Sequence, residues 1–266
     1  MPGEPWDPVE RDRRYASCKR AGLRRLISEG DSWFDYPPHP NIIDFLDGEG
    51  FWGIKRFEKS GDTLENIASD ANLARIASTA QKEKPEAILL SAGGNDLFTD
   101  IPEKPLLRWI WRALTQYDPS KTPADHVDRL VWDEKKTELR QGFVRVISAL
   151  SDYAPILIHG YDYLTASGEK CMYDGFHPAG PWILPSMRDR GIVDQDLQTA
   201  ILRVLIDDVN EIYRCIGKHI SRLSDLRRSS WNPSSWPRLD ERDTSHRRRV
   251  SPSRRTLPRR VDEPTP

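Results

Sequence analysis

Three short stretches of small and polar residues could together carry out acyl transfer. Ser32 supplies a hydroxyl that could attack a carbonyl carbon. The N–H groups of Ser32 and Gly61 and the side-chain amide of Asn95 could donate hydrogen bonds to the oxyanion formed in that attack. Each such donor contributes about 3 kcal/mol in known enzymes. The stretches are Gly30-Asp31-Ser32, Ser60-Gly61-Asp62 and Gly93-Gly94-Asn95-Asp96.

Each stretch also has a simpler interpretation. A Gly-Asp-Ser tripeptide is commonly a turn that caps the following helix. Gly61 alone would most often end a strand, and Asn95 alone would cap or turn the chain. Only their joint occurrence at the ends of successive strands favours the catalytic interpretation.

Strands and helices alternate along the part of the chain that carries these stretches. Apolar runs predict strands over 24–28, 52–61, 86–94 and 154–160, with a further strand at 220–226. Helical spacing of apolar residues predicts helices over 62–81, 124–153 and 196–219. This alternation indicates an α/β fold with a parallel sheet and helices on both faces. Ligands of such sheets lie beyond the carboxyl ends of the strands, where the three stretches fall.

Composition argues against several classes of protein. The net charge is −1, which is not typical of a polyanion-binding protein. No run of about 18 apolar residues predicts a membrane span. Cys18, Cys171 and Cys215 form no C-x-x-C pair, and the first residues contain no secretory signal, so we expect reduced thiols in a cytoplasmic protein. No histidine pair has metal-ligand spacing, so we expect neither a metal nor a cofactor.

The sequence predicts three parts. Residues 1–22 are expected to form a polar arm, and residues 23–226 a catalytic domain with a Trp-rich insertion at about 102–125. Residues 227–266 are rich in Arg, Ser and Pro and are expected to be a disordered tail. Its arginines could contact nucleic acid, but a mixed Arg, Ser and Pro composition is more typical of a solvated segment.

Over about residues 24–226, the chain resembles the SGNH (GDSL-type) hydrolase family. The segments GDSWFDYP, SGDTLENIA and SAGGNDL resemble the first three sequence blocks of the family, in a subgroup that carries GDSWFDYP. The resemblance implies a flavodoxin-like three-layer α/β/α sandwich and metal-free hydrolysis of a small-molecule ester. It also implies that Ser32 is the nucleophile, with Gly61 and Asn95 in the oxyanion hole. Trp33 departs from the leucine that many members have.

The general base is the element that the sequence leaves open. The family uses an Asp-x-x-His segment after the last strand, where the histidine deprotonates the serine. Asp174 and His177 match in DGFHP, which comes too early in the chain, and Asp243 and His246 match in DTSH. Both pairs are also compatible with plain surface or tail residues.

An altered C-terminus would explain the missing base. One hypothesis is that the gene has shifted frame between Leu226 and Asp240, because residues 242–251 can be encoded by codons whose shifted frame contains His-Pro. The chain would then be an impaired serine esterase. The alternative is a binding module that keeps the fold without a working base.

Overall fold

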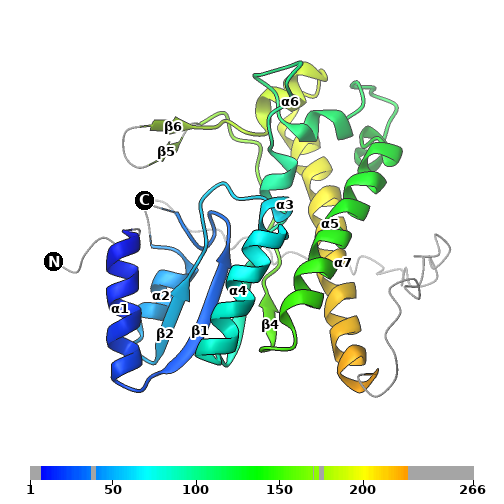
Figure 1. The fold of residues 1–266 in the computed structure, drawn as a ribbon. Coiled ribbons are helices and arrows are strands. Elements are labelled where there is room, and N and C mark those ends of the chain that lie inside the picture. Colours follow the sequence, from blue (N-terminus) through cyan, green and yellow to red (C-terminus); the bar gives the residue numbers. More distant parts are fainter. Residues whose placement is uncertain (1–6, 37–39, 170, 174–176, 227–266) are drawn as a thin grey trace, which may run out of the picture. The chain divides into compact units, whose positions relative to one another are not determined.

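A four-stranded parallel sheet forms the centre of the α/β unit (Figure 1). The computed structural model describes residues 7–36, 40–169, 171–173 and 177–226. The chain divides into two units, Met1–Ser221 and Arg222–Pro266, and the first contains all the strands described. The central strands are β1 (Arg24–Gly30), β2 (Trp52–Arg56), β3 (Ala87–Ser91) and β4 (Ile156–Ile158). Their order, β2-β1-β3-β4, is that of the first four strands of a flavodoxin-like sheet, which confirms the expected fold class.

Helices surround this sheet, and two short strands pair with each other outside it (Figure 1). The α-helices are α1 (Pro8–Arg20), α2 (Ile42–Gly48), α3 (Leu64–Ile67), α4 (Asp70–Glu83), α5 (Arg129–Leu150), α6 (Leu184–Asp189) and α7 (Gln195–Leu226). The 3-10 helices are η1 (Asn95–Leu97), η2 (Trp109–Ala113) and η3 (Pro123–His126). The outer pair is β5 (Cys171–Tyr173) and β6 (His177–Ala179), which run antiparallel.

Successive side chains of β1 and β3 enter two different hydrophobic cores. Ile27 and Ile88 belong to the larger core, which includes residues of α3, α4, α5 and α7. Leu26 and Leu89 belong to a smaller core with Ile43 of α2. Both faces are thus buried, which is why β3 appears as a continuous apolar run in the sequence. At the edge, β4 pairs with β3 alone among the described residues, and Leu157 is 56% exposed.

The residues expected to form a polar arm contain helix α1, which packs against β2. The side chain of Asp7 caps the helix by accepting a hydrogen bond from the N–H of Val9 at 2.9 Å. Tyr15 is buried, and its hydroxyl donates to Glu83 at 2.8 Å. A Cβ at Gly53 would lie only 3.0 Å from the Cys18 side chain, so the glycine permits the close approach of α1 to β2.

Two elements differ from the sequence-based expectations. The helix expected over 62–81 is two helices, α3 and α4, separated by Ala68 and Ser69. The prediction of a strand over 220–226 is wrong, because these residues continue α7 to Leu226. Ile216, Ile220 and Leu223 follow the helical spacing of the preceding apolar residues, which explains the continuation. None of the described helices is long and apolar enough to cross a membrane.

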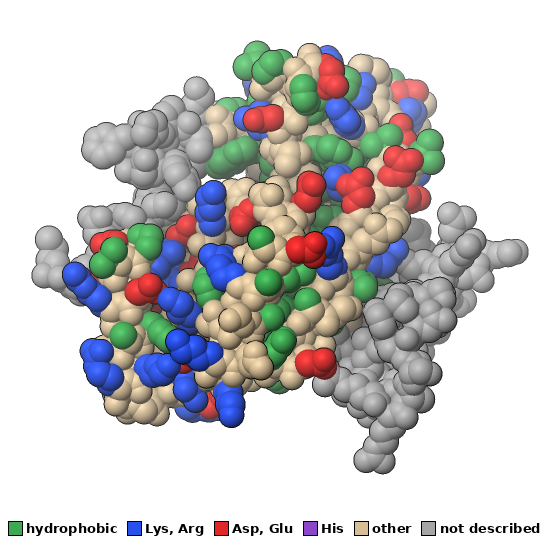
Figure 2. Space-filling view, in the orientation of Figure 1, with side chains coloured by type: hydrophobic (Ala, Val, Ile, Leu, Met, Phe, Trp, Pro, Cys, Tyr) green, Lys and Arg blue, Asp and Glu red, His purple; other side chains and the backbone are tan. Residues whose placement is uncertain are grey.

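Basic side chains gather over the α1 region on the face shown in Figure 2. Several of the basic residues in and near α1 form ion pairs. Lys19 contacts Glu83 at 2.7 Å, and Arg14 contacts Asp47 at 2.8 Å. Local acids therefore offset part of the positive charge.

Glu29 is a buried acid on β1, with 1% of its surface exposed. Its carboxylate accepts hydrogen bonds from Asn72 Nδ2 at 3.0 Å and from the Gly30 N–H at 3.0 Å. Arg75 lies 3.6 Å away. Burial outweighs these favourable contacts and raises the pKa of Glu29 to about 8.

We expect Glu29 to make the protein less stable as the pH rises. Because its folded-state pKa of about 8 exceeds the unfolded value of about 4.3, the folded state retains a proton that the unfolded state loses. This contribution is therefore full below about pH 4 and declines until the pH passes about 8. Glu29→Gln should raise the free energy of unfolding by about 2–4 kcal/mol at pH 8.5 relative to the native chain, and much less at pH 4.5.

Urea denaturation at pH 4.5 and pH 8.5 measures this difference. Glu65→Gln is the matched control, because Glu65 is exposed. A difference between the native chain and Glu29→Gln that does not grow with pH would contradict the expectation.

Candidate active site

The first three strands of the chain end close together at the carboxyl edge of the sheet. Gly30, the last residue of β1, is in register with Ser91, the last residue of β3. A Cβ at position 30 would lie 2.7 Å from the Ser91 carbonyl oxygen, so only glycine allows this approach. Ser32 follows β1 by two residues, and Asn95 follows β3 by four. The sheet therefore brings the turns that carry Ser32 and Asn95 to neighbouring positions.

Ser32 lies in a single tight turn whose hydrogen bonds are made by Asp31. The Asp31 carbonyl oxygen accepts from the N–H groups of Phe34 and Asp35, each at 3.0 Å. Asp31 Oδ1 accepts from the N–H of Trp33 at 3.1 Å. The capping interaction expected of a Gly-Asp-Ser turn is thus made by Asp31. The half-buried Ser32 has no side-chain hydrogen bond to any residue in the described part of the chain.

Asn95 begins η1 and connects the β3 turn to the β2 turn. Its Nδ2 donates to the carbonyl oxygen of Asp62 at 2.9 Å. An amide NH₂ group has two hydrogens, so one remains for a ligand. Gly61, next to Asp62, has a φ of +79°, a left-handed conformation that favours glycine. Asp96 adds a second connection by accepting from the N–H of Leu64 at 2.9 Å, and burial raises its pKa.

Ser32 and Asn95 line the same cavity, which has a volume of about 350 Å³. Most of the remaining wall is apolar or aromatic. Its residues include Leu97, Phe98, Leu164, Trp182, Ile206 and Val209. Gly61 is not among the lining residues, so the structure brings two of the three expected groups to the cavity.

A hydrogen-bonded chain beneath the Ser32 turn was not anticipated from the sequence. Ser91 Oγ donates to Asp31 Oδ1 at 2.7 Å, and His159 Nε2 lies 2.8 Å from Ser91 Oγ. On the other side, the Tyr161 hydroxyl donates to Asp31 Oδ2 at 3.0 Å and accepts from the Gly94 N–H at 3.0 Å. Burial, reinforced by neighbouring Tyr213 and Asp31, raises the pKa of Tyr161 well above its usual value, so its hydroxyl remains a donor.

His159 directly follows β4, so the strand-end rule that singled out Ser32 and Asn95 could have found it. Its ring lies against two residues of the Ser32 turn. The ring centroids are 5.8 Å apart for Trp33 and 5.6 Å apart for Phe34.

The two Asp/His pairs expected to supply the general base fall mostly outside the described residues. Asp243 and His246 lie outside the described residues, as does the whole expected tail, 227–266. Asp174 also lies outside them. His177 belongs to β6, but its side chain is not among those described. Both pairs therefore remain predictions.

The two acids of the Ser32 turn, Asp31 and Asp35, have separate protein partners. Asp31 accepts from Ser91 and Tyr161, and Asp35 contacts Arg11 at 2.5 Å. In the described ranges, no group of three or more His, Cys, Asp or Glu side chains could hold a metal ion.

Comparison with solved structures finds distant structural likenesses. No protein-family model matches the chain, and no curated protein matches its sequence. A solved structure from Parabacteroides merdae ATCC 43184, named as a GDSL-like lipase, matches with a TM-score of 0.33 and 13% identity. The match covers 71% of this chain and 76% of that chain.

Proposed function

We propose that the chain is a serine esterase of the SGNH (GDSL-type) hydrolase family, with Ser32 as the nucleophile. The observation that carries the proposal is the single cavity lined by both the Ser32 turn and Asn95. The resemblance of GDSWFDYP, SGDTLENIA and SAGGNDL to the family blocks supports it.

In the proposed reaction, Ser32 Oγ attacks the ester carbonyl carbon and gives its proton to a general base. The carbonyl oxygen becomes an oxyanion, which the second Asn95 Nδ2 hydrogen and the N–H groups of Ser32 and Gly61 would stabilise. Collapse breaks the ester C–O bond, and the base gives the proton to the departing alcohol. Water then attacks the acyl-Ser32 ester, giving a proton to the base, which returns it to Ser32 Oγ as the acid leaves. We assign the base to His246 with Asp243, or alternatively to His177 with Asp174.

The cavity wall indicates the kind of ester. Aliphatic and aromatic side chains around Ser32 favour a substrate with an apolar group next to the ester, since they offer few polar partners. A volume of about 350 Å³ suits a small molecule. We also propose a cytoplasmic location, which the reduced thiol of Cys18 supports.

A second candidate function is a binding module that retains the fold and the cavity but does not hydrolyse its ligand. It is favoured by one observation. The histidines with described side chains, His126 and His159, make their hydrogen bonds to groups other than Ser32.

Covalent labelling of the full-length chain with a fluorophosphonate tests the esterase. We expect the mass of one phosphonyl group on the peptide that contains Ser32, because an activated serine in an oxyanion hole attacks this probe. Ser69→Ala, which removes an exposed serine, should label normally. Urea-unfolded protein should not be labelled. Modification elsewhere, or equal modification of folded and unfolded protein, would argue for the binding module.

A further inference from the structure

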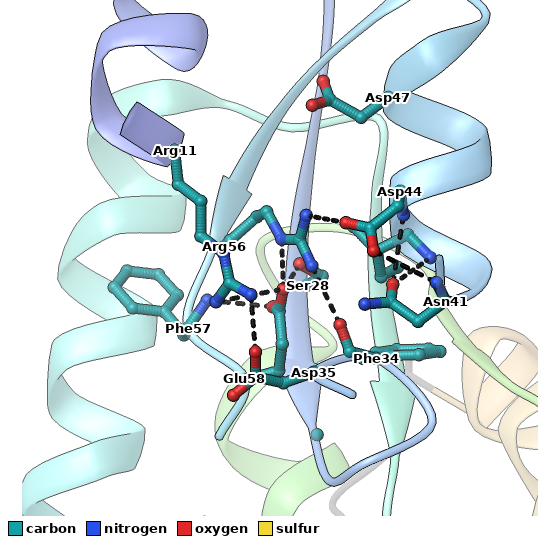
Figure 3. A network of polar contacts seen from close by, with 12 residues as sticks. Arg11, Ser28, Phe34, Asp35, Asn41, Asp44, Asp47, Arg56, Phe57 and Glu58 are labelled. Carbon is teal, nitrogen blue, oxygen red and sulfur yellow. Dashed lines mark hydrogen bonds and ion pairs between the residues drawn. The ribbon is translucent and has the colours of Figure 1, made fainter. Parts of the chain in front are cut away.

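A buried ionic network lies beside the Ser32 turn, and Figure 3 shows it from close by. At its centre, the Arg56 side chain is only 2% exposed and contacts Asp44 at 2.5 Å. Arg56 also forms a short ion pair with Glu58 and donates to the Phe34 carbonyl oxygen at 2.9 Å. Glu58 is fully buried and accepts from Ser28 Oγ at 2.6 Å. The network thus holds the backbone of the Ser32 turn at Phe34.

Arg11 joins this network from helix α1. Its Nη2 contacts Asp35 Oδ1 at 2.5 Å, and its Nη1 lies 4.0 Å from Glu58 Oε1. The side chains of Arg11 and Asp35 are 11% and 15% exposed, so solvent screens this ion pair only weakly. Arg11 is thus the contribution of α1 to a group of charges that also includes Asp44 of α2 and Arg56 of β2.

Asp35 connects the two turns that the proposed reaction needs. It lies three residues after Ser32, and its second oxygen, Oδ2, accepts a hydrogen bond from the Ser60 N–H at 2.9 Å. Ser60 precedes Gly61, whose N–H is a proposed oxyanion donor. One carboxylate thus joins the Ser32 turn to the Gly61 turn, and Arg11 fixes the orientation of that carboxylate.

We propose that Arg11 and Asp35 are positioning residues, which hold the Ser32 turn and the Gly61 turn in a fixed relation through the Arg11–Asp35–Ser60 contact. The proposal rests on the esterase function for its catalytic consequence, because neither residue lines the cavity. Misplacement of a reacting group by about 1 Å can lower a rate about 100-fold, so a contact of this kind has a large effect at a distance.

Amide hydrogen exchange and fluorophosphonate labelling of the full-length chain test this proposal together. In Arg11→Ala and Asp35→Ala we expect exchange of the Ser60 amide to rise about tenfold or more, because its acceptor is displaced or removed. Labelling of Ser32 should slow about tenfold or more, and ester hydrolysis should lose kcat with little change in KM.

Asp12→Asn is the matched control. Asp12 is on the same helix, but its ion pair is with Lys55 of β2, at 2.5 Å, and not with a residue of either turn. It should leave exchange and labelling unchanged. The double variant Arg11→Ala/Asp35→Ala leaves neither charge unpaired, which guards against misfolding of the single variants. Its effect on Ser60 exchange and on labelling should be close to that of Asp35→Ala alone, because both variants break the same Arg11–Asp35–Ser60 contact.

Two results separate this proposal from the proposed function. Ser60 exchange in Arg11→Ala equal to that in Asp12→Asn would overturn the positioning role, whatever the labelling shows. A native chain that is never labelled at Ser32, with fast Ser60 exchange in the variants, would instead contradict the esterase and retain the connection between the turns.

Discussion

Ser32→Ala is expected to lower kcat for a chromogenic short-chain ester by about 10³- to 10⁶-fold, with little change in KM. The nucleophile takes part only in bond making, whereas the cavity wall and Asn95 still bind the ester. The residual rate would come from the remaining oxyanion donors, which act without the serine. Steady-state kinetics on the purified full-length chain measures the effect.

Ser69→Ala should leave the rate within about twofold of the native chain, because it removes only an exposed hydroxyl. His177→Ala and His246→Ala, measured in parallel, identify which histidine serves as the base. Equal rates for the native chain and Ser32→Ala would contradict the esterase and favour the binding module.

Phe143→Ala is expected to lower the free energy of unfolding by about 3–5 kcal/mol. Phe143 is fully buried on α5 and meets the Tyr213 ring edge-on, with centroids 5.2 Å apart. Tyr213 in turn donates to the Ala92 carbonyl oxygen at 2.9 Å. The Phe143 ring also lies 3.5 Å from where a Cβ at Gly93 would be. Loss of the Phe143 ring therefore leaves a void directly under the turn that presents Asn95.

Urea denaturation of the native chain and the variant measures this loss. Leu130→Ala is the control on the same helix, since Leu130 is 73% exposed and its loss should change stability by less than about 0.5 kcal/mol. A loss below about 1 kcal/mol for Phe143→Ala would show that the core around α5 collapses to fill the void.

The fold could be predicted because local patterns determine most of it. Apolar runs identified β1, β3 and β4, of which β3 is buried throughout, and helical spacing identified α4, α5 and most of α7. The parallel direction of the strands followed from the alternation of strands and helices. The error at 220–226 arose because a short apolar run fits a strand and a helix about equally well.

The candidate site could be predicted only in part, for a physical reason. Ser32 and Asn95 were found because each follows a strand that the sequence identifies. The contacts that hold them join residues far apart in the chain, such as His159 with Ser91 and Asp35 with Arg11. Patterns in a single sequence contain no information on such pairing. The hydrogen bonds beneath the Ser32 turn and the ionic network could therefore be identified only from the structure.

The origin of the C-terminal residues stays a prediction that the coding sequence can decide. A coding strand whose shifted frame gives no His-Pro near residues 242–251 would end the frame-shift hypothesis. The kinetics of His246→Ala then shows whether the residues actually present serve as a base.

The outer edge of β4 has a consequence for how the molecule behaves in concentrated solution. Among the described residues β4 has one neighbour, and the free edge of such a strand presents N–H and C=O groups onto which a strand of a second molecule can add. The exposed Leu157 would be covered by such an addition. Because β4 has only three residues, few hydrogen bonds can form there. We therefore expect self-association by this route to be weak and to increase with protein concentration.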